Sequence, residues 1–114
     1  MLEKRKFIRL KAPLGVIYRV VRKHKRLKQQ ASFIKDLSGA GVCLYCKEEL
    51  RQGDLIQMEI QIPHLEDSVR AVGEVVWVAL RPEHGTHEVG VRFRDAEPRS
   101  LSHILEYVYA IGIG

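Results

Sequence analysis

The sequence predicts an all-β fold, a six-stranded antiparallel β-barrel followed by a C-terminal α-helix. Two observations carry this prediction. From residue 14 onward apolar and polar residues alternate with period two, and turn residues separate the alternating segments, which is typical of antiparallel strands with one buried face. After Pro98 the apolar residues recur at helical spacing instead. The length of 114 residues suits one domain with one core.

Six segments carry the alternation, at residues 14–22, 28–37, 42–47, 54–62, 69–80 and 87–94. The clearest is 54–62, in which Ile56, Met58 and Ile60 alternate with polar residues, so one face is expected to be buried and the other wet. Gly73 in the fifth segment indicates a bulge or bend that lets the sheet curl into a barrel. Trp77, flanked by valines in the same segment, is expected in the core.

Turns and a terminal helix complete the predicted fold. A basic turn at 23–26 joins the first two strands, and a small-residue turn at 38–41 joins the second and third. Gly39 in that second turn is expected to adopt a positive φ. The helix is expected to begin near Pro98, to end at the terminal glycines and to cap the barrel. Its apolar positions are Leu101, Ile104, Leu105 and Val108.

Positive charge is concentrated at the N-terminal end of the chain. Residues 1–28 hold eleven Lys and Arg against one acid, whereas the whole chain has a net charge of +5. This asymmetry points to an anionic partner, which could be a nucleic acid, a nucleotide or a membrane surface.

Composition and cysteine usage predict a cytoplasmic globular protein. Hydrophobic residues make up 46% and charged residues 29%, as in ordinary globular domains. We find no apolar run long enough for a membrane span and no apolar core of a signal peptide. Two cysteines are too few for a disulfide framework.

Catalytic and metal-binding patterns are weak in this sequence, so we expect a binding module and not an enzyme. The five histidines are scattered and suggest no grouping with serine and a carboxylate. His84 and His87 lack a second ligand pair at zinc spacing. Cys43 and Cys46 lie three apart on a predicted strand, so their sulfurs should point to opposite faces and not share a metal or a disulfide.

Two groups of residues are suited to an anionic ligand. Arg5 and Arg9 lie four apart in an N-terminal arm, residues 1–13, which precedes the barrel of residues 14–114. Asp36, Ser38 and Gly41 lie at the turn between the second and third strands. An arginine fork suits an anionic group, to which it can donate two parallel hydrogen bonds.

These motifs resemble the signature of the PilZ domain, the bacterial receptor module for cyclic di-GMP. The resemblance covers Glu3-x-Arg5-Lys6-Phe7-x-Arg9, Asp36-x-Ser38-x-x-Gly41, Val76-Trp77-Val78 and Gly90-Val91-Arg92-Phe93. It implies a six-stranded barrel with a C-terminal helix.

The same resemblance implies roles for five residues. Arg5 and Arg9 would clamp guanine and phosphate, and Asp36 would accept hydrogen bonds from the guanine N1–H and N2–H₂ donors. Ser38 would add a hydroxyl contact, and Gly41 would let the ligand approach the backbone.

The sequence is therefore expected to encode a stand-alone receptor for cyclic di-GMP, with no other cofactor. It would relay the signal to an unidentified effector protein, in motility, biofilm or exopolysaccharide control. Neither nucleic-acid binding nor a membrane span is expected. One alternative is a small basic nucleic-acid-binding barrel, although such barrels usually display exposed aromatic residues. Another is a ligand-free PilZ-like interaction module, in which Arg5 or Arg9 pairs with Asp36.

Overall fold

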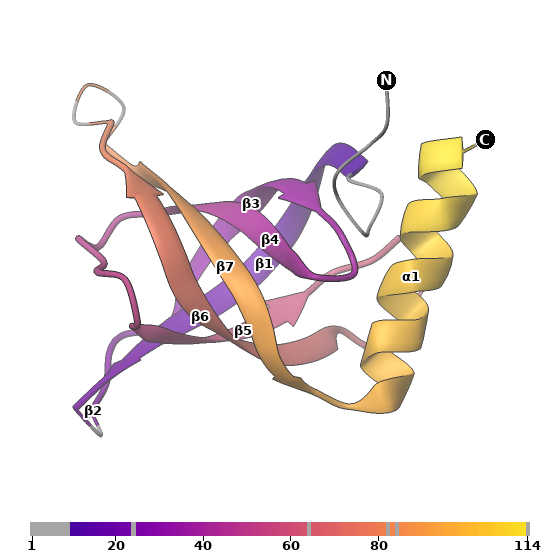
Figure 1. Ribbon diagram of the computed structural model, residues 1–114, viewed down its shortest axis with the longest axis horizontal. Helices are drawn as coiled ribbons and strands as arrows, with labels where there is room; N and C mark the ends of the chain where they lie inside the picture. Colours follow the sequence, from indigo (N-terminus) through magenta and orange to yellow (C-terminus); the bar gives the residue numbers. More distant parts are fainter. Residues whose placement is uncertain (1–9, 24, 64, 82, 84, 114) are drawn as a thin grey trace.

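A computed structural model describes residues 10–23, 25–63, 65–81, 83 and 85–113, which form seven strands and one helix (Figure 1). The predicted all-β class with a C-terminal helix is confirmed. The elements are β1 (Leu10–Arg22), β2 (Lys25–Arg26), β3 (Gln30–Leu37), β4 (Gly41–Cys46), β5 (Leu55–Ile60), β6 (Val69–Ala79), β7 (His87–Ala96) and α1 (Pro98–Ile113).

Six of these strands close into a barrel. The order around the ring is β1, β3, β4, β7, β6 and β5, and β5 pairs with β1 to complete it. Every neighbouring pair is antiparallel. The two-residue strand β2 pairs with β1 alone and forms a hairpin that projects from the barrel at the lower left of Figure 1. Lys23 makes this tight turn with a φ of 50°.

Strand β1 begins at Leu10, four residues before the predicted start at residue 14. Its pairing with β3 shifts register between Lys11 and Leu14. Pro13 lies inside this irregular stretch and has no N–H to donate to a neighbouring strand. The period-two pattern is interrupted there, which is why the sequence did not predict that the strand includes residues 10–13.

Two register shifts lie between β6 and β7. The first lies between Val72 and Gly73, where irregularity was predicted, but the extra residue there is Arg94 of β7, so the bulge is in the partner strand and not in β6. A second shift lies between Val75 and Trp77. Because a bulge moves the following side chains to the other face, Trp77 points outward and is 40% exposed. The prediction that Trp77 lies in the core is therefore wrong.

Tyr18 shows how the barrel interior accommodates a polar group. The side chain is 1% exposed, and its hydroxyl donates to Glu48 Oε1 at 2.7 Å. The same hydroxyl accepts the Lys47 N–H at 3.1 Å. Both functions of the phenol are satisfied, so Tyr18 can pack among the aliphatic side chains of the core.

The two cysteines occupy different faces of β4, as the sequence predicted. Cys46 belongs to the core, and burial raises the pKa of its thiol to about 12. Cys43 follows Val42, a core residue, and so lies on the outer face. Both cysteines are buried, and the high pKa makes Cys46 a packing residue and not a nucleophile.

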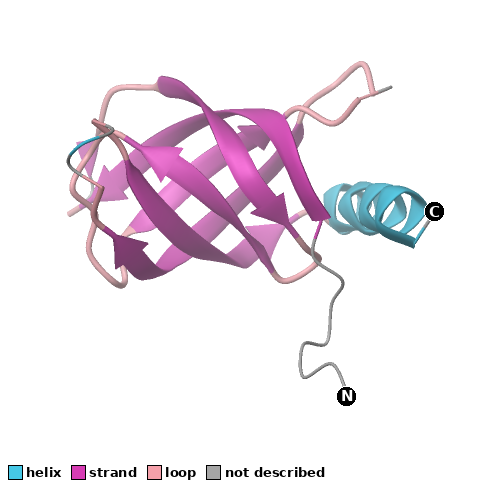
Figure 2. Ribbon diagram, turned by 90° about the horizontal axis from the view of Figure 1, so that it is seen from above, coloured by secondary structure: helices cyan, strands magenta, loops and turns pink. Residues whose placement is uncertain are grey.

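Helix α1 packs against one end of the barrel (Figure 2). Ile104 and Val108 supply its buried contact, with 0% and 1% of their surface exposed. The helix continues through Gly112 to Ile113, so the glycine does not end it there, which agrees with the modest helical cost of a single glycine. Among the described residues, no helix is both long and apolar enough to cross a membrane.

Candidate functional site

Asp36 lies near the end of β3, on the outer face of the barrel. Its neighbour Leu37 belongs to the core, so Asp36 must face the other way. A bulge between Ile34 and Asp36 inserts Lys35 as an extra residue at this point. Asp36 is nevertheless only 8% exposed.

Ser38 organises the turn that follows Asp36, which we name the motif turn, residues 36–41. Its N–H donates to the Gly41 carbonyl at 2.9 Å. Its hydroxyl oxygen accepts the N–H groups of Ala40 at 3.1 Å and Gly41 at 3.3 Å. The hydroxyl therefore has a structural role in shaping the turn.

The motif turn contains two glycines, Gly39 and Gly41, and the packing of the strands requires the second of them. A Cβ on Gly41 would lie 2.0 Å from the carbonyl oxygen of Val91. Close approach of β4 to β7 therefore requires glycine at residue 41, whether or not a ligand binds. The prediction of a positive φ at Gly39 is wrong, because the described glycines with positive φ are Gly53 and Gly85.

Arg5 and Arg9 lie outside the described residues, but the strand that follows them is described. Leu10 pairs with Leu37, and Lys11 pairs with Asp36. Arg9 is the covalent neighbour of Leu10, so the arm joins the barrel beside the motif turn. This register places the start of β1 and the motif turn at the same end of the barrel.

Residues that pair across neighbouring strands form a row that starts at Asp36 and crosses the outer face of the barrel. Asp36 pairs with Cys43, Cys43 with Gly90, and Gly90 with Trp77. A Cβ on Gly90 would lie 2.0 Å from the indole Nε1 of Trp77, so the indole covers this glycine. The sequence does carry a signal for this contact, since Gly90 occupies an outward position in a regular strand, where glycine marks a close approach.

An ion-pair cluster lies beside this row, and the sequence analysis did not identify it. Lys35 Nζ is 2.6 Å from Glu88 Oε1, and Arg81 Nη2 is 2.7 Å from Glu88 Oε2. Glu88 faces outward yet is only 5% exposed. The hydrogen bond from Lys35 lowers the pKa of Glu88, outweighing burial, which acts in the opposite direction, and Arg81 lowers it further.

Protonation of Glu88 at acid pH should lower the stability of the folded chain. Because the pKa of Glu88 is lower in the folded chain than its unfolded value of about 4.3, its contribution to stability is present above that value. The contribution is lost as pH falls through the lower folded pKa. We expect the Tm of Glu88→Gln to lie below that of the wild type at neutral pH and to converge with it between about pH 5 and about pH 3.

Thermal melts across this pH range measure the convergence. Glu106→Gln, at an exposed glutamate of α1, is the matched control and should leave the Tm close to that of the wild type throughout. A constant Tm difference between Glu88→Gln and the wild type, from neutral to acid pH, would contradict the assigned ion pairs.

Comparison with known proteins agrees with this barrel fold. The PilZ domain family model matches residues 3–110, and the chain therefore belongs to the PilZ domain family. No curated protein matches the sequence significantly.

Solved structures share the fold at low sequence identity. The inhibitor of motility MotI/DgrA from Bacillus subtilis superposes with a TM-score of 0.81 at 13% identity, over 98% of this chain and 53% of that chain. The PilZ domain of YcgR from Escherichia coli, solved with c-di-GMP, has a TM-score of 0.67 at 14% identity, over 97% of this chain and 93% of that chain.

The complex of K. pneumoniae MrkH with c-di-GMP has a TM-score of 0.71 at 15% identity, over 99% of this chain and 53% of that chain. This chain thus spans about half the length of MotI/DgrA and MrkH, and nearly all of the YcgR PilZ domain. At these identities the likeness concerns the fold.

Proposed function

We propose that this chain is a receptor for cyclic di-GMP and acts by binding, without catalysis. The observation that carries the proposal is the pairing of Lys11 with Asp36. It joins the segment after Arg5 and Arg9 to the strand that bears Asp36. Membership of the PilZ family supports the choice of ligand, and the YcgR and MrkH structures were solved with c-di-GMP.

The chemistry of the motif residues fits the two edges of guanine. Arg5 and Arg9 each offer a planar fork of donors for O6 and N7, together with a charge for the phosphodiester. Asp36 offers only acceptors when ionised, and these suit the N1–H and N2–H₂ donors of the opposite edge. Ser38 would contact base or phosphate while holding the turn, and Gly41 would keep the β4 backbone close to the ligand.

The bound state would differ from the free state at the surface formed by the arm and the motif turn. A ligand held by Arg5 and Arg9 on one side and by Asp36 on the other would tie the arm to the barrel. A separate effector protein would then recognise this altered surface. The barrel core lies elsewhere, so β5, β6 and β7 would change little.

Replacing Asp36 tests this assignment. Asp36→Asn keeps the shape of the side chain but replaces one of its two acceptor oxygens by an NH₂ donor and removes the charge, so one guanine donor loses its acceptor and affinity for cyclic di-GMP should fall at least about tenfold. Calorimetry measures the affinity, and an NMR spectrum of the variant verifies the fold.

The matched control for this experiment is Asp67→Asn, an exposed aspartate between β5 and β6. It changes the net charge equally and should bind like the wild type. If Asp36→Asn retains wild-type affinity while folded, Asp36 does not recognise guanine.

A further inference from the structure

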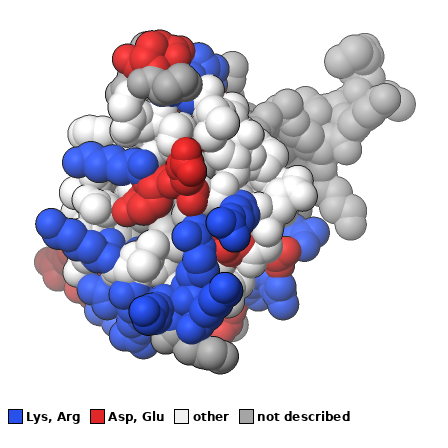
Figure 3. Space-filling view, turned by 90° about the vertical axis from the view of Figure 1, so that its left-hand side faces the viewer, with Lys and Arg blue, Asp and Glu red and all other residues white. Residues whose placement is uncertain are grey.

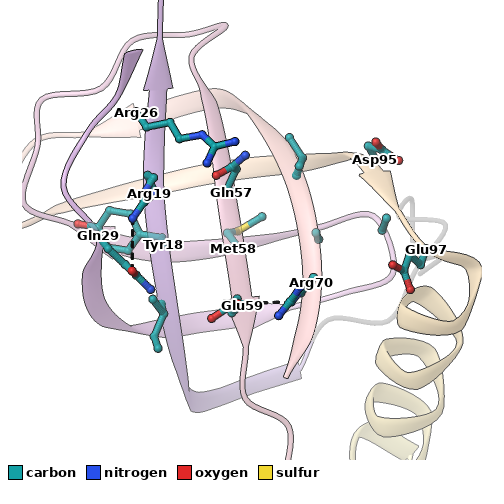
Figure 4. Close-up of a pocket in the computed structure, with 14 residues that line it drawn as sticks. Tyr18, Arg19, Arg26, Gln29, Gln57, Met58, Glu59, Arg70, Asp95 and Glu97 are labelled. Atoms are coloured by element: carbon teal, nitrogen blue, oxygen red, sulfur yellow. Dashed lines mark hydrogen bonds and ion pairs between the residues drawn. The ribbon is translucent and has the colours of Figure 1, made fainter. Parts of the chain in front are cut away.

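A groove runs across the outer faces of β1, β5 and β6, and we name it the β1–β5–β6 groove. Its volume is about 450 Å³. In the order of strands around the barrel, β5 and β6 lie opposite β3 and β4, which carry the motif turn. The groove is therefore separate from the candidate nucleotide site. Figure 4 shows the side chains that line it.

One end of the groove is basic. Arg19 on β1 and Arg26 on β2 line it, with Gln29 and Gln57 beside them. Arg19 Nη2 donates to Gln29 Oε1 at 3.4 Å. Arg19 Nε is buried and has no hydrogen-bond partner among the described residues, which is unfavourable for a guanidinium N–H. A carboxylate at this end of the groove would pair with the guanidinium and, once Arg19 turns toward it, would give Nε–H the missing acceptor.

The surroundings of this end add to the attraction for an acid. Residues 14–35 hold seven Lys and Arg and no Asp or Glu. Figure 3 shows Lys and Arg gathered over the lower part of the face that carries the hairpin. A positive field of this kind speeds the approach of an acidic partner.

The other end of the groove carries carboxylates. Glu59 pairs with Arg70 at 3.4 Å, and Asp95 and Glu97 line the wall near α1. Between the two ends the accessible lining is apolar, from the half-buried side chains of Ile17 and Val72. The groove therefore has a basic end, an apolar middle and an acidic end.

This charge pattern distinguishes a peptide from a nucleic acid. A continuous phosphate backbone would meet the carboxylates at the acidic end, which would repel it. Bases would also find no stacking surface, because Tyr18 is the aromatic side chain among the lining residues, and it is 1% exposed with its hydroxyl bonded to Glu48. A polypeptide can place acids at one end only, and Gln29 and Gln57 offer amide groups for its backbone.

We propose that the β1–β5–β6 groove binds an acidic segment of a partner protein, whose carboxylates pair with Arg19 and Arg26. The segment lies across the strands, with its acids at the hairpin end and its apolar side chains over the middle of the groove. The inference does not depend on cyclic di-GMP, since the groove lies away from the motif turn.

An NMR titration of the full chain tests the proposal. The probe is a capped synthetic peptide of about eight residues, which spans about 26 Å when extended, with glutamates in one half and leucine and glycine in the other. The Nε–H signal of Arg19 should move in a saturable way as peptide is added. The same peptide with glutamine in place of glutamate should leave this signal unmoved.

Two pairs of variants separate the groove from general charge attraction. Arg19→Gln with Arg26→Gln should weaken peptide binding at least about tenfold. Lys25→Gln with Lys28→Gln removes the same charge from exposed residues of the hairpin region that do not line the groove, and should weaken binding less than about threefold. Arg26→Gln alone, at an exposed residue, keeps the comparison informative if the change at Arg19 disturbs the fold.

Several results would overturn the proposal. They are the absence of a saturable shift at Arg19, equal loss in the two variant pairs, and equal binding of the glutamine peptide. Tighter binding of an oligothymidylate of equal charge would assign the basic surface to nucleic acid instead.

Discussion

Arg9→Ala is expected to weaken cyclic di-GMP binding at least about tenfold, which corresponds to about 1.4 kcal/mol or more. The fork of Arg9 would make two charge-assisted hydrogen bonds to one guanine edge or to a phosphate, and alanine removes both. Arg9→Lys should cost nearly as much, because an ammonium keeps the charge but loses the planar pair of donors. Calorimetry with the three proteins measures the difference.

A control for this experiment comes from an arginine outside the motif. Arg51→Ala, at an exposed residue in the loop between β4 and β5, removes the same charge at the end of the barrel away from the motif turn. It should bind cyclic di-GMP like the wild type. If Arg9→Lys also binds like the wild type, bidentate recognition by Arg9 is wrong and only its charge matters.

Gly41→Ala is expected to lower the free energy of unfolding by about 3 kcal/mol or more. The new Cβ would lie 2.0 Å from the Val91 carbonyl oxygen and 3.0 Å from the Arg92 Cα. Both are backbone atoms of β7, the strand to which β4 is paired, so the two strands must separate to relieve the contact. A thermal melt should show a fall in Tm on the order of 10 °C.

The matched control for Gly41 is Gly85→Asn. Gly85 has a φ of 70°, which asparagine tolerates, and a Cβ there would meet no atom within 4 Å. Its Tm should stay close to that of the wild type. A Gly41→Ala variant that keeps its Tm but loses cyclic di-GMP binding would contradict strand packing as the main requirement and would favour close approach of the ligand.

Most of the fold follows from local patterns in the sequence, and the assignment of Trp77 to the core failed because of a bulge. The regular alternation of Ile56, Met58 and Ile60 predicted β5 to within one residue at its start and two at its end. The bulge before Trp77 depends on how β6 pairs with β7, and no period in β6 itself reports this pairing. A single extra residue reverses the faces, and so Trp77 was assigned to the wrong side.

The sequence identified which types of residue make up the candidate site, but it did not predict how these residues are arranged in the fold. Asp36, Ser38 and Gly41 were chosen for their chemistry toward a ligand, whereas the structure also gives two of them a role in the fold. Ser38 caps the N–H groups of its own turn, and Gly41 allows β4 to approach β7. Glu88 was not identified, because Lys35 and Arg81 come from β3 and from the chain after β6 and meet it only in the folded barrel.

Isothermal titration calorimetry of the wild-type chain with cyclic di-GMP tests the proposed receptor function most directly. Cyclic di-AMP and a single-stranded oligonucleotide serve as parallel ligands. We expect saturable binding of cyclic di-GMP with a Kd of about 10 µM or tighter. Cyclic di-AMP should bind at least about tenfold more weakly, because adenine offers a different set of donors and acceptors to Arg5, Arg9 and Asp36. The absence of heat with cyclic di-GMP, equal affinity for the two dinucleotides, or tighter binding of the oligonucleotide would contradict a guanine-specific receptor.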